Sequence, residues 1–363
     1  MTQSFIPGVH LFRAGERADA VEALAERLGG RVGIAGVLGD LNRTAKVVDV
    51  PGTAAVWGFG WSDEDSRSQR WFPQGITTSA DQGDAEKVNG RQIVCTSWYS
   101  HDVGGVHKGS RVTFVDVTDR FRPRYRHVLL VEPLVASDGV VDVVPLKVHA
   151  GGLAWHGPYL HVAGTAQGIY SFSLDDILRV YSGGDPHQLR VRGNGRVDSF
   201  GYRYVLPVRF KYDALAGDAF AKLRYSFLSI DRSTHPHHLV AGEYGNRAMT
   251  TRLVSYELDP ETSLLREHEE DGSARPLSMY DGGVRAMQGA TVVNRTYYVT
   301  TSAGRYGRGS LWVGRPGRLK RFARVLPVGP EDISYWPSTG QLWSLTEYPG
   351  RRYVFAMNRS DFG

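Results

Sequence analysis

The chain has 363 residues, a formal net charge of +5 and a pI of about 9.2. Hydrophobic residues make up 41% and charged residues 22%, as in a soluble globular protein, and no run approaches the ~18 uninterrupted apolar residues of a membrane span. A single cysteine, Cys95, excludes an internal disulfide, and its place in an apolar strand-like run favours a buried, unreactive thiol.

The basic residues cluster most densely at 190–196 and 315–324, beside expected strand edges and turns. Charges at such positions discourage edge-to-edge pairing, and aromatic residues are not interleaved with them as in a nucleic-acid surface. We therefore expect neither a nucleic-acid nor a membrane partner. The first twenty residues lack the basic start and apolar middle of a secretory signal, which predicts a cytoplasmic protein.

Near the N-terminus, residues 19–28 carry apolar side chains at a 3.6-residue period and end at Gly29-Gly30, which predicts a short helix. Residues 30–60 then hold short runs at β spacing, and residues 62–69 read as a polar loop. We expect residues 1–60 to supply this helix and the strands that close the fold.

From residue 70 to residue 360, short apolar strands and turn-forming residues recur in five units. The units begin near residues 71, 148, 200, 287 and 327. Such units cannot bury both faces alone, and radial repetition solves that problem. The sequence therefore predicts an all-β fold, a single five-bladed β-propeller domain over residues 1–363. Six blades are the alternative if residues 30–60 form their own sheet, and a two-sheet sandwich is the other architecture considered.

Polar residues stand within two positions of a glycine at the start of most units: Gln74, His149, Gln288 and Glu331. In the third unit the match is loose, and Tyr204 or Tyr202 is the expected equivalent. Innermost strands of a propeller run in one direction, so these side chains should converge at one mouth of the central tunnel. Alternatively, these polar side chains hydrogen-bond to one another and fill the channel, without forming a functional site.

At such a mouth, His149 and Glu331 would transfer protons, and Tyr204 would donate a proton or stabilise an oxyanion. Gln74 and Gln288 would bind the substrate. Trp98 and His156 could line the pocket, and Arg285 could contact an anionic ligand.

A divalent cation such as Ca²⁺ would use Glu331, Asp332 and His149, but one histidine and one secure carboxylate make a thin ligand set. We therefore expect no cofactor.

Three segments, 149–172, 287–302 and 329–355, resemble a group of largely uncharacterised actinobacterial β-propeller proteins, many of them secreted. More distantly, their pattern is similar to strictosidine synthase and lactonase-like propellers. The resemblance covers roughly residues 70–360 and implies a propeller with chemistry at the tunnel mouth. The metal-site motifs of the lactonase-like proteins are not matched, so their activity is not carried over.

The sequence thus predicts an enzyme acting on a small organic molecule by acid–base chemistry, as a cyclase, lyase or hydrolase, in specialised metabolism. The alternative is a non-catalytic propeller that binds a carbohydrate, peptide or protein through the rim loops 82–91, 181–196 and 260–276. A glycosidase would need two or three carboxylates around the pocket, and the adjacent Glu331 and Asp332 cannot flank one bond.

Overall fold

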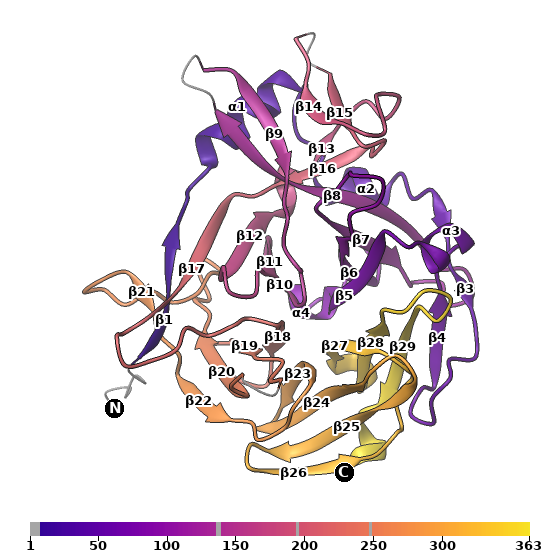
Figure 1. Ribbon diagram of the computed structural model, residues 1–363, viewed down its shortest axis with the longest axis vertical. Helices are drawn as coiled ribbons and strands as arrows, with labels where there is room; N and C mark the ends of the chain where they lie inside the picture. The colour runs from indigo at the N-terminus through magenta and orange to yellow at the C-terminus, as the bar shows by residue number, and fades with distance from the viewer. Residues whose placement is uncertain (1–7, 136–138, 194–195, 247–248) are drawn as a thin grey trace.

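Antiparallel strands arranged around one axis make up most of the molecule (Figure 1). The computed structural model describes residues 8–135, 139–193, 196–246 and 249–363; the first seven residues and two residues of the predicted loop 181–196 lie outside this range. Within the described residues, five sheets of four or more strands each place one strand at the axis. These inner strands are β5 (Trp71–Thr78), β10 (Leu153–His156), β18 (Phe227–Asp231), β23 (Met287–Val293) and β27 (Pro330–Trp336).

Each inner strand contacts the next in that order, and β27 contacts β5, so the ring is closed. A closed ring of radially placed sheets is a β-propeller. The predicted all-β propeller is confirmed, and the two-sheet sandwich is excluded.

The sheets are unequal in size, so the prediction of five like units is not met. Two are four-stranded: β18 with β19 (His238–Gly242), β20 (Arg252–Glu257) and β22 (Ser278–Asp281), and β23 with β24 (Thr296–Ala303), β25 (Gly307–Arg315) and β26 (Arg318–Phe322). A third has five strands: β27, β28 (Gln341–Thr346), β29 (Tyr353–Asn358), β4 (Trp57–Gly60) and β3 (Lys46–Val47).

The other two sheets are enlarged. One has β10, β11 (Tyr159–Ala163), β12 (Ile169–Ser173), β17 (Phe210–Ala216), β1 (Val9–Ala14) and β21 (Ser273–Ala274). The other has β5, β6 (Ile93–Ser100), β7 (Ser110–Asp116), β8 (Arg124–Val135), β16 (Tyr204–Pro207), β13 (Leu178–Arg179), β2 (Arg43–Thr44) and β9 (Val141–Pro145). The expected start of the third unit, residues 200–212, therefore extends these two sheets instead of forming its own.

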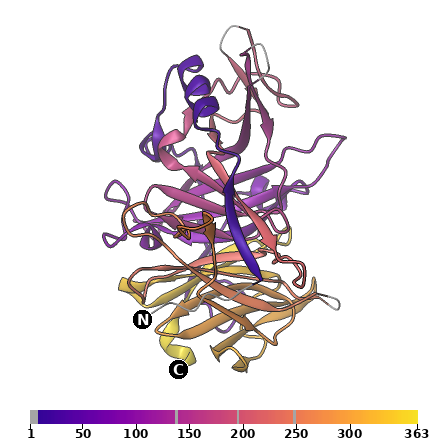
Figure 2. The same cartoon turned by 90° about the vertical axis from the view of Figure 1, so that its left-hand side faces the viewer.

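On one side of the ring, β8, β9 and the small sheet of β14 (Leu189–Val191) and β15 (Val197–Ser199) project outward together with helix α1 (Figures 1 and 2). Helix α1 (Ala18–Arg27) lies within a residue of its predicted range and packs Val21, Leu24 and Ala25 against this projection.

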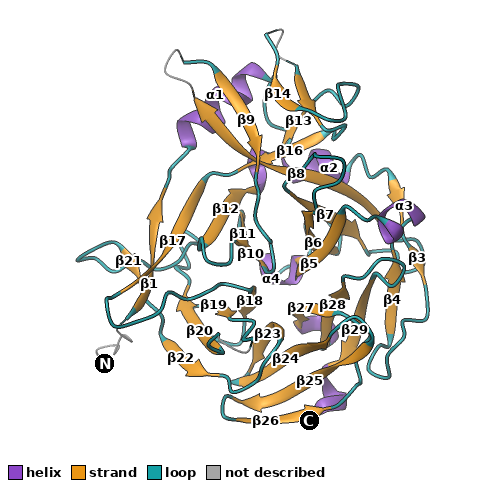
Figure 3. Cartoon of the chain, in the orientation of Figure 1, coloured by secondary structure: helices purple, strands orange, loops and turns teal. Residues whose placement is uncertain are grey.

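The remaining helical segments are short (Figure 3). They are α2 (Gly33–Leu38), α3 (Asp63–Arg67), α4 (Ser79–Gln82), η1 (Leu174–Asp176), η2 (Pro337–Thr339) and η3 (Arg359–Phe362). The run 32–38, predicted at β spacing, thus forms a helix that buries Val37 and Leu38, and the predicted loop 62–69 contains α3. None of the helices in the described ranges is long and apolar enough to cross a membrane.

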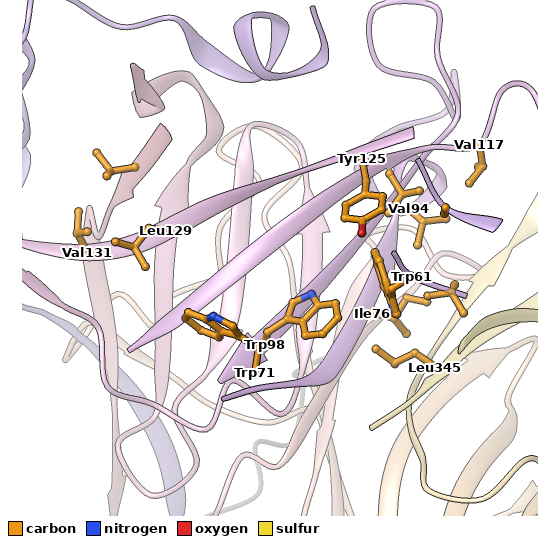
Figure 4. Packing of buried hydrophobic residues seen from close by; sticks show 14 of the residues in the cluster. Trp61, Trp71, Ile76, Val94, Trp98, Val117, Tyr125, Leu129, Val131 and Leu345 are labelled. Atoms are coloured by element: carbon orange, nitrogen blue, oxygen red, sulfur yellow. The ribbon is translucent and has the colours of Figure 1, made fainter. Parts of the chain in front are cut away.

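The largest core cluster lies between the β5–β8 sheet and the β27–β29 sheet (Figure 4). Trp61 packs edge-on against Trp98 and Tyr125, with ring centroids 4.9 and 5.0 Å apart. Strand β4 belongs to the same region and pairs with β29, so an N-terminal segment completes the sheet that ends the chain. Cys95 is buried on β6, and burial raises the pKa of its thiol, in keeping with an unreactive side chain.

Candidate functional site

A cavity of about 790 Å³ opens at one end of the propeller axis, here called the axial pocket. Side chains from the start of every inner strand, or the residues just before it, line this pocket: Gln74, His149, Ser226, Gln288 and Glu331. The structure thus brings together the four polar residues that the sequence places within two positions of a glycine. At the third inner strand, β18, the residue that lines the pocket is Ser226 and not the predicted tyrosine.

Glycines on the inner strands allow this convergence because they let neighbouring backbones touch. A Cβ on Gly152 would lie 2.2 Å from the Leu228 nitrogen, and one on Gly289 would lie 2.6 Å from the Asp332 Cα. Real Cβ atoms do not approach so closely, so only glycine fits. The narrow axis then holds the polar side chains at its mouth near one another.

Glu331 lines the axial pocket and is almost fully buried. The Gln288 Nε2 donates a hydrogen bond of 3.1 Å to its Oε1. Burial raises the pKa of Glu331 well above its ordinary value, and the charges of Glu347 and Asp332 raise it further.

A second carboxyl group in the pocket, Glu347, was not predicted from the sequence. It follows β28, and the antiparallel register that pairs Pro330 with Thr346 carries it back beside Glu331. The Gln74 Nε2 donates to its Oε2 at 3.3 Å. Burial raises the pKa of Glu347 as well, so the pocket holds two carboxyl groups that resist ionisation.

His149 is exposed to the pocket, with its ring centroid 4.4 Å from that of Tyr99. The surrounding protein and the nearby His101 disfavour the charged imidazole and lower its pKa. His149 and Glu331, the predicted proton-transfer residues, line the same pocket, but no hydrogen bond or ion pair joins these two described residues.

Tyr99, which follows Trp98 on β6, also lines the axial pocket. Its hydroxyl lies 3.0 Å from the His101 Nε2. Burial, with the charges of Glu347 and Glu331, raises the pKa of Tyr99 to about 12. A phenol that stays protonated at neutral pH is a hydrogen-bond donor for a ligand. Tyr244 and Tyr348 also line the pocket.

Four predicted site residues lie elsewhere. Tyr204 sits on β16 in an outer part of its sheet, where its hydroxyl donates to Asp40 at 2.8 Å. Trp98 is a core residue, because side chains alternate along β6 and it is Tyr99 that faces the pocket.

His156 lines a separate small cavity, with its Nε2 3.2 Å from the Nδ1 of His237. Arg285 is exposed and lines another cavity. Tyr202, the alternative to Tyr204, contacts Arg111 outside the axial pocket.

Asp332, the other carboxylate of the predicted metal set, does not line the axial pocket. Its Oδ2 accepts the backbone N–H groups of Ile76 and Leu153, both at 3.2 Å, and so ties three inner strands together. Across the described ranges, no group of three or more His, Cys, Asp or Glu side chains is arranged to hold a metal ion.

No protein-family model matches the chain, and no curated protein sequence matches it. Among solved structures, similar ones include the propeller domain of Myceliophteria thermophila Cps50 (Swd1), with 9% identity, 80% of this chain and 97% of that chain covered, and a TM-score of 0.38. The β-xylosidase RS223 has 10% identity over 79% and 92% of the two chains, with a TM-score of 0.36.

The gluconolactonase XC5397 of Xanthomonas campestris is 13% identical over 88% of this chain and 86% of its own, with a TM-score of 0.32. These similarities are too low to bear on function.

Proposed function

We propose that the protein is an enzyme that performs acid–base chemistry on a small polar molecule in the axial pocket. The observation that carries the proposal is the presence of two carboxyl groups with raised pKa values, Glu331 and Glu347, in one cavity with a neutral imidazole, His149. Groups with pKa values shifted toward neutrality are what proton transfer requires.

In a hydrolytic reaction, protonated Glu331 would give its proton to the substrate oxygen as the bond to that oxygen breaks. His149 or ionised Glu347 would take a proton from the attacking water. Gln74 and Gln288 each donate a hydrogen bond to one carboxyl group, and both line the pocket. A lyase or cyclase would use the same acid and base, with the proton removed from the substrate itself.

A screen with nitrophenyl esters, nitrophenyl glycosides and lactones tests the proposal, using wild type, Glu331→Gln, Glu347→Gln and His149→Ala. Loss of a positioned acid or base lowers the rate by roughly a hundredfold or more. We expect that loss in the Glu331 variant, and retained activity in Lys320→Gln, which changes an exposed residue outside the pocket. Full turnover in all three pocket variants would reject the proposal and favour the alternative, a binding protein that uses its rim loops.

The proposal also includes expectations about blade number, kinship, cellular location and partners. The five inner strands support treating the sheets as five blades. The resemblance to lactonase-like propellers stays a prediction. The actinobacterial kinship, a cytoplasmic location and the absence of metal and nucleic-acid partners stay predictions.

A further inference from the structure

A second cavity, of about 390 Å³, lies apart from the axial pocket, where α3 and the loop 200–203 meet strands β7 and β8. We call it the basic cavity. Five cationic side chains line it, against two acidic ones: Arg43, Lys108, Arg111, Arg126 and Arg203, with Glu64 and Asp65.

The carboxylate of Asp65 is already fully engaged. It accepts from Arg111 at 2.8 Å, from Tyr125 at 2.7 Å and lies 3.0 Å from the His127 Nε2. Arg43 lies 3.4 Å from Glu64, which is mostly exposed, and 3.4 Å from Asp65. Arg126 and Arg203 are paired with Asp40, at 3.3 and 3.0 Å.

Lys108 has no such partner. Its Nζ lies 5.2 Å from the ring centroid of Phe200 and donates to the Pro186 carbonyl at 2.9 Å. Among the residues that the structure describes, no carboxylate lies within 4.0 Å of this amine. Burial, followed by the charges of Arg70 and Arg111, lowers the pKa of Lys108, as expected where positive charge is in excess.

Arg111 forms the inner wall. Its side chain is 4% exposed and its Nε is buried without a hydrogen-bond partner. The guanidinium lies over the rings of Trp71 and Trp98, 4.5 and 4.6 Å from their centroids, so it is held rigidly.

We propose that the basic cavity binds a small phosphate-type oxyanion, free or as part of a larger molecule, between Lys108 and Arg43 with Arg111 behind it. A doubly charged oxyanion would neutralise the excess cations and supply Lys108 with the anionic partner that it lacks among the described residues, and partial burial strengthens such charge-assisted bonds. Trp71 and Phe200 would flank an attached organic group.

Titration calorimetry with inorganic phosphate, at ionic strength held constant with chloride, tests this site. We expect saturable binding of one phosphate to wild type and roughly tenfold weaker binding to Lys108→Gln and to Arg43→Gln, the loss of one charge-assisted contact. Lys320→Gln is a matched control, because Lys320 also lies over a phenylalanine ring, 5.0 Å from the centroid of Phe322, but does not line the basic cavity.

Glu331→Gln should bind phosphate as wild type does, since it alters only the axial pocket. Melting temperatures without phosphate show whether each variant is folded. Absence of saturable binding to wild type would overturn the proposal, and so would equal affinities of Lys108→Gln and Lys320→Gln for phosphate.

Discussion

Glu331 in the axial pocket and Asp65 in the basic cavity are both buried, but their pKa values shift in opposite directions. Glu331 has an amide partner and carboxyl neighbours, so burial raises its pKa. For Asp65, burial alone would raise the pKa, but His127, Arg111 and the Tyr125 hydroxyl outweigh it and hold the pKa well below its ordinary range. Glu331 is therefore suited to exchange a proton, whereas Asp65 is a fixed charge that organises its surroundings.

Removing the charge of Asp65 should destabilise the fold. We expect Asp65→Asn to lower the free energy of unfolding at pH 7 by about 3–5 kcal/mol, because Arg111 would be left buried without its counter-ion. Since the folded-state pKa of Asp65 is depressed, its contribution is present above the unfolded value of about 3.9 and is lost as pH falls further.

Urea denaturation of wild type and Asp65→Asn at pH 7 and pH 3 measures this difference, with exposed Asp361→Asn as the control. The difference between wild type and Asp65→Asn should shrink in acid. An equal difference at both pH values would contradict the assignment.

The sequence predicted those pocket residues that belong to a local, repeated pattern. Gln74, Gln288 and Glu331 each lie at the start of an inner strand, and Gln74 and Gln288 precede a glycine, so a repeated pattern identified them. Glu347 has no such pattern. It reaches the pocket only through the register of β27 and β28, a relation between two strands.

Strand β6 shows how one element serves both core and site. Trp98 faces the core, whereas Tyr99 faces the axial pocket, as alternation along a strand requires. We expect Trp98→Ala to lower the free energy of unfolding by about 3–5 kcal/mol, because it empties a fully buried site. Tyr99→Phe, which removes only a hydroxyl, should cost about 1 kcal/mol or less.

Thermal melts of the two variants separate these effects, and the activity screen supplies the second measurement. Tyr99→Phe should alter turnover or substrate binding. Equal destabilisation by the two substitutions would contradict the assignment of the two faces.

Among the elements, periodicity identified helix α1 but misassigned α2, whose short apolar run fits a strand equally well. Residues 204–207 were expected to begin a unit. They instead pair in parallel with β8, with Val205 opposite Leu129, a partnership between distant segments that no local pattern reveals.

For the whole molecule, close contact of the inner strands decides whether the ring can form. Gly152→Ala should lower the free energy of unfolding by about 3 kcal/mol, because the new Cβ would meet the β18 backbone at 2.2 Å. Gly217→Ala is the control, since a Cβ there has nothing within 4 Å. Equal unfolding midpoints in urea for the two variants would show that the ring is less tightly packed than described.

The most direct test of the central claim is the pKa of the Glu331 carboxyl group, measured by ¹³C NMR of protein labelled at glutamate carboxyl carbons. Glu331→Gln assigns the signal. We predict a pKa well above the ordinary value of about 4.3, and a fall toward that value in Glu347→Gln, where the neighbouring negative charge is removed. A Glu331 that titrates near its ordinary value and does not respond to the Glu347 substitution would contradict an acid–base site in the axial pocket.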